Sequence, residues 1–188
     1  MTTDVITLIT SDHRKVETLF ERLQKKQGDQ RATVAELHAL LIAHARAEED
    51  RVYPGIDAHH GVEEHKEAEV LLDSLVRAEP GTAEFEETLV KLVEAVSHHV
   101  EEEENELLPE LAKQAGEKRL KELGAAFAQR RDEELRALAA SNGSATSQAG
   151  GASPTKEELY RKAQEADIPG RSQMSKDELE KAVGKAGS

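Results

Sequence analysis

Two stretches of the sequence each carry a histidine and a glutamate four residues apart, shortly before a proline. The first, HARAEEDRVYP, begins at His44 and contains Glu48, and the second, HHVEEEENELLP, contains His99 and Glu103. In both stretches the proline follows the histidine by ten residues. Residues four apart lie on the same face of a helix, so each stretch directs an imidazole and a carboxylate the same way. Side chains of these two types are ligands for transition-metal ions.

Two further histidines lie on apolar stripes when the sequence is followed in helical steps of three and four. His13 lies three residues before Val16, and His65 lies four residues before Glu69. Together with the two stretches above, four predicted core-facing stripes each contain a histidine, and three of them also contain a carboxylate. A single histidine on an apolar stripe is usually a hydrogen-bonded core residue, and a single His–Glu pair four residues apart is usually a surface contact. Residues of either kind are compatible with a structural bundle that binds no metal. The coincidence on four helices favours metal binding.

Bound cations would remove the cost of burying these groups. An ionised glutamate inside a bundle is unfavourable unless it is paired, and a neutral imidazole needs a partner for each ring nitrogen. The chain has no cysteine, so histidine and glutamate ligands favour iron or manganese over a structural zinc site. Because seven side chains exceed the four ligands usual for zinc, we interpret the stretches as halves of a site for two ions. The predicted ligands are His13, His44, Glu48, His65, Glu69, His99 and Glu103.

The elements that position these residues are predicted to be helices. Of the 188 residues, 34% are charged, 37% are hydrophobic and 3% are aromatic, which is typical of helices with a Leu, Val, Ile and Ala core. Short connections with Gly or Pro favour an antiparallel, up-down-up-down four-helix bundle followed by one more helix. The apolar stripe of the third helix is predicted to include Leu72, Leu75 and Val76. The helices are predicted at roughly 4–26, 31–53, 61–78, 82–108 and 111–140.

The sequence divides into three predicted segments, a bundle at 1–140, a flexible Ser/Gly/Ala-rich linker at 141–153 and a small helical module at 154–188. The last segment has seven basic and seven acidic residues, so the net charge of −13 belongs to residues 1–153. That part should repel nucleic acid and anionic membranes. No secretory signal or membrane-spanning run is recognisable, so we expect a cytoplasmic protein without a membrane partner.

Around the predicted ligands, the sequence resembles the hemerythrin-like proteins with His-His-Glu (HHE) cation-binding domains. The resemblance covers about residues 1–140, and the spacing, order and prolines all agree. The matching elements are SDHRKVETLF around His13, HARAEEDRVYP from His44, EEHKEAEVLL around His65 and HHVEEEENELLP with His99.

The resemblance implies a four-helix bundle with two iron ions in an oxo- or hydroxo-bridged, non-heme di-iron centre. It assigns Glu48 and Glu103 as bridging carboxylates, with Glu104 as the alternative to Glu103. The terminal ligands that it implies are His13, His44, His65 and His99.

Two departures separate this sequence from the oxygen-carrying members of that family. Glu69 stands where those carriers have a second histidine, and Glu103 follows its histidine by four residues where they have an aspartate at five. A shell richer in carboxylates stabilises ferric iron and lowers the reduction potential. We therefore expect reaction with O2, H2O2 or NO, including catalase-like detoxification in oxidative stress. The alternative is a non-catalytic iron or oxygen sensor that signals through its C-terminal module.

Other polar residues near the stretches have two interpretations or are predicted at the surface. Tyr53 is a candidate to hydrogen-bond an oxygen species at the centre, with packing at the edge of the core as the alternative. The neighbouring acids are predicted to form a solvated face: Glu49, Asp50, Glu64, Glu101 and Glu102. The remaining histidines are predicted at the surface: His38, His59, His60 and His98.

The C-terminal segment contains two capping boxes, Thr155 with Glu158 and Ser175 with Glu178, which predict two short helices. It resembles a helix-extended-helix module related to the N-terminal domain of transcription terminator Rho and to SAP domains. That resemblance implies weak nucleic-acid contact, whereas the zero net charge of the segment favours docking to a protein. The residues implied for nucleic acid are Arg161, Lys162, Arg171 and Lys176.

Overall fold

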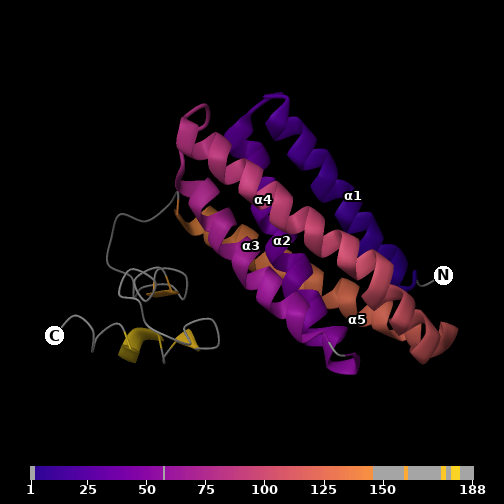
Figure 1. Cartoon of the computed structure of the whole chain (residues 1–188). Helices are drawn as coiled ribbons and strands as arrows, with labels where there is room; N and C mark the ends of the chain where they lie inside the picture. Colours follow the sequence, from indigo (N-terminus) through magenta and orange to yellow (C-terminus); the bar gives the residue numbers. More distant parts are fainter. Residues whose placement is uncertain (1–2, 57, 146–158, 161–174, 177–178, 183–188) are drawn as a thin grey trace. The chain divides into compact units, whose positions relative to one another are not determined.

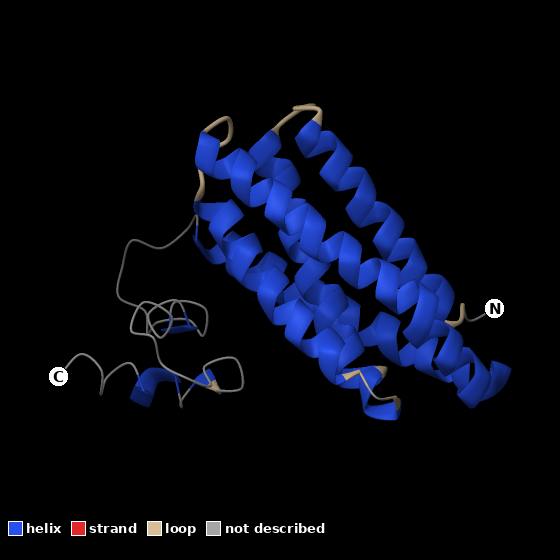
Figure 2. Ribbon diagram, in the orientation of Figure 1, coloured by secondary structure: helices blue, strands red, loops and turns tan. Residues whose placement is uncertain are grey.

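A computed structural model describes residues 3–56, 58–145, 159–160, 175–176 and 179–182. The chain divides into two compact units, Met1–Asn142 and Gly143–Ser188. Every regular element within the described residues is helical (Figure 2). The all-α prediction is therefore confirmed.

The first unit is a helical bundle in which sequence neighbours pack side by side (Figure 1). Short connections join α1 to α2 and α3 to α4, so these pairs form helical hairpins. A short 3-10 turn, Tyr53–Gly55, follows α2, and a π-helical turn, Glu103–Leu107, follows α4. The helices are α1 (Val5–Gln24), α2 (Gln30–Arg51), α3 (His59–Arg77), α4 (Ala83–Glu102) and α5 (Leu108–Ala145).

Polar side chains at three helix starts fix where the helices begin. The Asp4 carboxylate accepts from the Thr7 amide at 2.9 Å, and the Asp29 carboxylate accepts from the Ala32 amide at 3.1 Å. The Thr82 hydroxyl does the same for the start of α4. Each of these caps satisfies an amide that has no partner within its own helix, and this places the starts close to the predicted ones.

Two hydrophobic clusters lie along the bundle, and the buried ligands lie near the boundary between them. The first cluster includes Val16 of α1 and Val96 of α4, and the second includes Ile9 of α1 and Leu108 of α5. His13 lies between the two clusters on α1, because its neighbours Ile9 and Val16 belong to different ones. The polar residues therefore occupy a layer inside the bundle, with apolar packing on both sides.

The inward face of α3 differs from the predicted one by about one residue. Leu72 and Leu75 are buried, but Val76 is 45% exposed, so its predicted place in the core is wrong. The residues of α3 that face the core include His65, Leu72 and Leu75. The predicted face, which runs from His65 through Glu69 to Val76, is therefore displaced from the buried one. Glu69 and Val76 are seven residues apart and share a helix face, so both are turned from the centre of the bundle.

The predicted break at Pro109 is also wrong, because the helix continues through the proline. The π-helical turn Glu103–Leu107 leads directly into α5, and Pro109 occupies the first turn of that helix, where a missing amide costs little. The chain changes direction at Gly116, which has φ 66° and ψ 164°. A positive φ is readily adopted by glycine, so Gly116 rather than Pro109 ends the fourth rod of the bundle.

After Gly116, α5 packs along α1 and α2. Leu123 and Phe127 join the cluster that contains Val5 and Ile9 of α1 and Ala47 of α2. Gly124 allows a close approach, because a Cβ at this position would lie 2.3 Å from the carbonyl oxygen of Thr3 and 2.9 Å from the amide nitrogen of Val5.

Gly124→Ala is therefore expected to destabilise the bundle by about 1–3 kcal/mol, since backbone must move to admit the methyl group. Urea unfolding followed by circular dichroism measures the change. Gly55→Ala is the matched control, because a Cβ at Gly55 meets nothing within 4 Å. Equal stabilities of the two variants would contradict the close packing of α5 on the start of α1.

The second unit is described at only a few residues. Leu159 and Leu179 are buried, and the Leu179 amide donates to the Ser175 carbonyl at 3.0 Å. The rest of the predicted linker after residue 145 lies outside the described residues, as do Thr155, Glu158, Arg161, Lys162, Arg171 and Glu178. In the described part of the chain, no helix has the length and apolar character needed to cross a membrane.

Candidate metal centre

Each of the first four helices contributes one predicted histidine to the polar layer. The four imidazoles are between 2% and 9% exposed, and Glu48 and Glu103 are fully buried. Glu48 comes from the last turn of α2, and Glu103 begins the π-helical turn after α4. The structure therefore brings six of the seven predicted ligands into one interior region. The histidines are His13 of α1, His44 of α2, His65 of α3 and His99 of α4.

The first group consists of His13, His44, Glu48 and Glu103, whose facing atoms lie within 4.8 Å of one another. His44 Nε2 lies 3.1 Å from Glu48 Oε1, and His13 Nε2 lies 3.2 Å from Glu103 Oε2. Two imidazoles and two carboxylates are thus close enough to hold one cation.

The second group consists of Glu48, His65 and His99, again within 4.8 Å. His65 Nε2 lies 3.3 Å from Glu48 Oε2 and 3.2 Å from His99 Nε2. Glu48 belongs to both groups, since it turns Oε1 to His44 and Oε2 to His65. Glu103 Oε2 also lies 3.8 Å from His99 Nε2, so both carboxylates lie between the groups.

Unsatisfied buried atoms show that these residues fit metal ions. His13 Nε2, His44 Nε2, Glu48 Oε1 and Glu103 Oε2 are buried and make no hydrogen bond, although they lie within 3.2 Å of one another in pairs. Buried polar atoms in proteins are nearly always satisfied, because an unmade hydrogen bond is costly. A cation between them would accept the imidazole lone pairs and neutralise the carboxylates. The donor set suits iron or manganese.

The charges in the centre also change how its groups bind protons. Burial and the nearby Glu48 carboxylate raise the pKa of Glu103 to about 7. Burial alone would lower the pKa of His44, but Glu48 and Asp12 outweigh it and raise that pKa to about 10. Against the same effect of burial, Glu48 and Glu49 raise the pKa of His65 to about 9. Without metal, protons therefore compensate the buried carboxylates at neutral pH.

Metal binding at pH 7 is expected to release protons. His44 and His65 hold protons below their pKa values of about 10 and 9, and an ion must displace them to reach the ring nitrogens. Affinity should therefore rise with pH up to that range and fall as the pH is lowered from 7. Anaerobic titration calorimetry with Fe²⁺ in two buffers of different ionisation enthalpy measures the protons released. Identical heats in both buffers would contradict this picture.

A second ring of carboxylates faces the outer nitrogen of each imidazole. Hydrogen bonds join three Nδ1 atoms to carboxylates, whereas His44 Nδ1 lies 3.6 Å from Asp12, beyond hydrogen-bond distance. A carboxylate behind a metal-binding imidazole fixes the ring orientation and raises its basicity. The hydrogen-bonded pairs are His13 with Glu104 at 2.8 Å, His65 with Glu49 at 3.2 Å and His99 with Glu64 at 2.9 Å.

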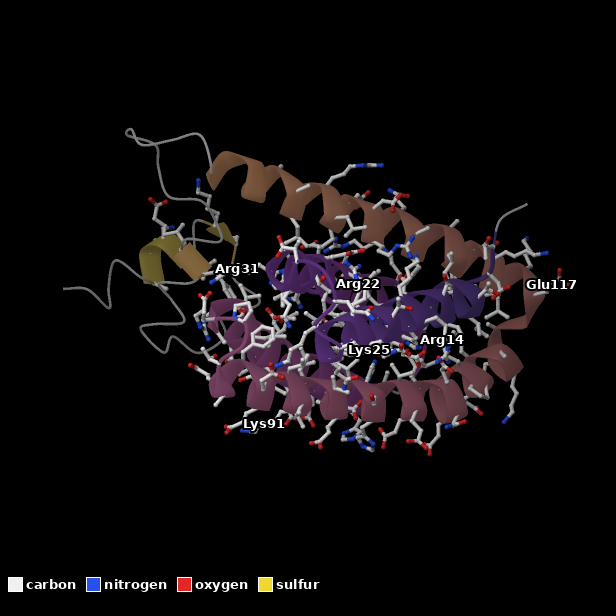
Figure 3. The ribbon with its side chains drawn as sticks, turned by 90° about the horizontal axis from the view of Figure 1, so that it is seen from above. Arg14, Arg22, Lys25, Arg31, Lys91 and Glu117 are labelled. Carbon is white, nitrogen blue, oxygen red and sulfur yellow. The ribbon has the colours of Figure 1, made fainter. Side chains whose placement is uncertain are left out.

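Arginines hold three of these four carboxylates. Arg14, labelled on α1 in Figure 3, donates to Glu104 at 2.8 Å, and Arg46 donates to Glu49 at 3.2 Å. Arg131 of α5 donates to both oxygens of Asp12, at 2.7 and 2.6 Å. Positive charge outside the ring thus pairs with these carboxylates where they face the imidazoles.

The fifth helix closes the centre on the side of α1 and α2. Besides the Arg131–Asp12 ion pair, Phe127 lies edge-on to the His44 ring with 5.8 Å between ring centroids. The sequence does not indicate this contact, because Arg131 and Asp12 are 119 residues apart.

Several acidic residues lie in places that the sequence did not indicate. Glu49 and Glu64 were predicted on a solvated face, but their side chains are 20% and 13% exposed and pair with imidazoles, so that prediction is wrong. Asp12 was missed, and its only signal is its position directly before His13. Glu104, the alternative to Glu103, faces His13 Nδ1 rather than the centre.

Glu69 is the one predicted ligand that the structure does not bring into either group. Its carboxylate pairs with Arg46 at 3.2 Å and is 22% exposed. This follows from the face of α3 that it shares with exposed Val76.

Tyr53 reaches the centre from the side of the second cluster. Its hydroxyl lies 3.4 Å from Glu48 Oε2, 3.5 Å from Glu103 Oε1 and 3.5 Å from His65 Nε2. The ring is 6% exposed and stacks on His65, so packing and contact with the centre occur together. Gly61 makes room, because a Cβ there would lie 2.9 Å from the hydroxyl oxygen.

A small cavity of about 40 Å³ adjoins the centre. All four histidines line it, together with the charged side chains of Arg46, Glu49, Glu64 and Glu69. The remaining walls are apolar, with Val16, Leu72, Val96 and Val100 among them. A volume of this size admits a ligand of a few atoms at most.

Comparisons with known proteins agree with this site. A family model described as Hemerythrin HHE cation binding domain matches residues 4–111, which contain all six converging ligands. A protein of Nostoc sp. named DNA nickase is 31% identical over 109 residues. The match covers 53% of this chain and 31% of that relative, so the chain spans less than a third of the relative's length. No solved structure matches. Because the family model covers more than half of the sequence, the chain belongs to the hemerythrin HHE cation-binding family.

Proposed function

We propose that the bundle holds a non-heme di-iron centre that reacts with a small oxidant, H2O2 foremost. The observation that carries this proposal is the position of Glu48, whose two oxygens face histidines of two different groups. Glu103 lies on the same boundary, at 3.2 Å from His13 and 3.8 Å from His99. The proposed ligands are His13, His44, Glu48, His65, His99 and Glu103, with Glu69 assigned to Arg46 instead.

Iron fits the proposal better than a redox-inactive ion because the ligand set mixes two shared carboxylates with four imidazoles. When bound, two iron ions would supply reversible one-electron changes for reaction with H2O2, O2 or NO. The protein supplies buried positions with apolar packing on both sides and fixes the imidazole orientations through the outer carboxylates.

The cavity supports a small-molecule ligand. Its volume of about 40 Å³ excludes organic substrates of ordinary size but accommodates a diatomic molecule or a peroxide. Apolar walls from Val16, Val96 and Val100 favour uncharged ligands over anions.

Tyr53 is proposed to hold a proton at the centre. Burial, followed by the carboxylates of Glu48 and Glu103, raises the pKa of its hydroxyl far above the ordinary value. The hydroxyl therefore remains protonated at any physiological pH and can donate a hydrogen bond to an oxygen atom beside the carboxylates.

Oxygen evolution from H2O2 by the iron-loaded full chain tests the reaction. We expect turnover well above that of free iron at the same concentration, and a loss of about tenfold or more in Tyr53→Phe with iron content unchanged. His38→Ala, which changes a histidine outside both groups, is the control and should keep full turnover. Turnover no greater than that of free iron would contradict the catalase-like reaction.

A sensor function is the second candidate, and the closure of the centre by α5 favours it. Phe127 packs against the His44 ring, and Arg131 pairs with Asp12. A change of the ion or ligand at His44 would therefore change the packing and stability of α5. If the protein is a sensor, amide exchange along α5 should slow strongly on iron binding while peroxide turnover stays negligible. Equal exchange with and without iron would contradict it.

DNA cleavage, which the name of the Nostoc relative indicates for that protein, is not proposed for this chain. The match covers 31% of the relative. The net charge of −13 opposes contact with a phosphate backbone.

A further inference from the structure

A second cluster of imidazoles and carboxylates lies outside the buried centre, where α3 and α4 face each other. His60 and Glu64 are four residues apart on α3, and His98 and Glu102 are four residues apart on α4. His60 Nε2 lies 3.7 Å from Glu64 and 3.7 Å from Glu102. His98 Nε2 lies 3.8 Å from Glu64 and 3.4 Å from Glu102. The facing atoms of His60, Glu64 and Glu102 lie within 4.8 Å of one another, and His98 lies beside this group.

The spacing of these atoms fits an ion better than direct hydrogen bonds. Distances of 3.4–3.8 Å between nitrogen and oxygen are long for hydrogen bonds. Ligand atoms about 2.0–2.1 Å from a tetrahedral ion lie about 3.3–3.4 Å from each other. His60, Glu64 and Glu102 are therefore close enough to hold one ion, and a rotation of the exposed His98 side chain would bring in a fourth ligand.

Glu64 provides an independent indication of a missing positive charge. Its Oε2 accepts from His99 Nδ1 at 2.9 Å, but its Oε1 is buried and makes no hydrogen bond. That unsatisfied oxygen is the one that faces His60 and His98. A buried carboxylate oxygen directed at two imidazoles is satisfied by a cation that all three bind.

The other outer carboxylates show what is different about Glu64. Glu104, Glu49 and Asp12 each face an imidazole of the centre and are each held by an arginine. Among the described residues, the ion pairs of Glu64 are all with histidines. Where an arginine pairs with each of the other three carboxylates, Glu64 instead has the imidazoles of His60 and His98, which are side chains that can bind a metal ion.

We infer that His60, Glu64, His98 and Glu102 form a separate site for one divalent first-row transition ion. Two imidazoles and two carboxylates suit Zn²⁺ or Co²⁺, which such a site binds more tightly than Fe²⁺, and two ligands on each helix hold the geometry. The His60 and His98 side chains are 69% and 63% exposed, so the ion enters from solvent without opening the bundle. Glu64 then touches this ion and His99 at once.

A cobalt titration of the full chain tests the site. We expect wild type to bind one more Co²⁺ per chain than the double variant His60→Ala/His98→Ala, with visible absorption typical of four-coordinate Co²⁺. Glu102→Gln should weaken binding of that extra ion by about tenfold or more. Both variants change side chains at the solvent boundary and should keep wild-type helicity, and His38→Ala is the matched control.

Equal Co²⁺ stoichiometry and affinity in wild type and in either variant would overturn the site. The test does not depend on the buried centre, because it measures only the Co²⁺ ion per chain that is lost when His60 and His98 are replaced. Glu48→Ala separates the two proposals, since it should lose the buried ions and keep the outer one.

Discussion

Glu48→Ala is expected to remove both metal ions from the buried centre. Glu48 is the residue common to both groups, with Oε1 at 3.1 Å from His44 and Oε2 at 3.3 Å from His65. Its loss takes one anionic ligand from each proposed ion and leaves Glu103, at 3.2 Å from His13 and 3.8 Å from His99, as the remaining carboxylate between them. Metal content per chain, measured after anaerobic loading with Fe²⁺ and gel filtration, should fall from about two ions to near zero.

Glu49→Ala is the matched control for that variant. Glu49 is the next residue in the chain, but it contacts His65 through Nδ1, on the side away from the centre. Loss of such an outer partner should weaken metal binding by about 10–100-fold without abolishing it at high iron. Both variants should retain wild-type helicity by circular dichroism. Two tightly held ions in Glu48→Ala would show that the centre is assembled differently.

Arg131→Met is expected to lower the free energy of unfolding by about 3 kcal/mol, because it leaves a buried carboxylate without its main partner. The side chain of Asp12 is fully buried, and Arg131 holds both of its oxygens. Burial alone would raise the pKa of Asp12, but His44 and Arg131 lower it to about 2, so the group is ionised in the folded protein. Lys15, at 3.2 Å, offsets part of the loss.

Urea unfolding of the chelator-treated protein measures this effect without a contribution from metal. Arg130→Met is the control, since Arg130 pairs with Asp50 and Glu134 closer to solvent and its removal should cost about 1 kcal/mol or less. The double variant Asp12→Asn/Arg131→Met should recover much of the stability, because no unpaired charge remains. If Arg131→Met is as stable as Arg130→Met, α5 does not close the centre through Asp12.

The helices and the inward-facing ligands could be predicted from the sequence because they are local properties. A histidine and a glutamate four residues apart lie on one face of any helix, whatever surrounds it. For the same reason, the placement of Glu48 and Glu103 in the interior followed from their spacing to His44 and His99. Asp12 and Arg131 have no such local signal, since their pairing depends on where α5 packs after Gly116.

The errors on α3 and at Pro109 have physical reasons that the sequence does not display. Because core positions in a helix recur after either three or four residues, the sequence allows more than one core-facing stripe on α3. The stripe through Glu69 and Val76 is displaced by about one residue from the stripe that is buried. Only packing against α2 and α4 decides between them. Pro109 looked like a helix end, but the preceding π-helical turn accommodates it, and such turns depend on tertiary contacts.

Four histidines and two glutamates are proposed to hold a pair of iron ions. Metal analysis of the freshly purified full chain, together with its ultraviolet–visible spectrum, tests this proposal most directly. We expect about two irons per chain, near-ultraviolet charge-transfer absorption and a lower melting temperature after chelation. A protein that is purified without metal, takes up no added Fe²⁺ and melts identically with and without chelator would contradict it.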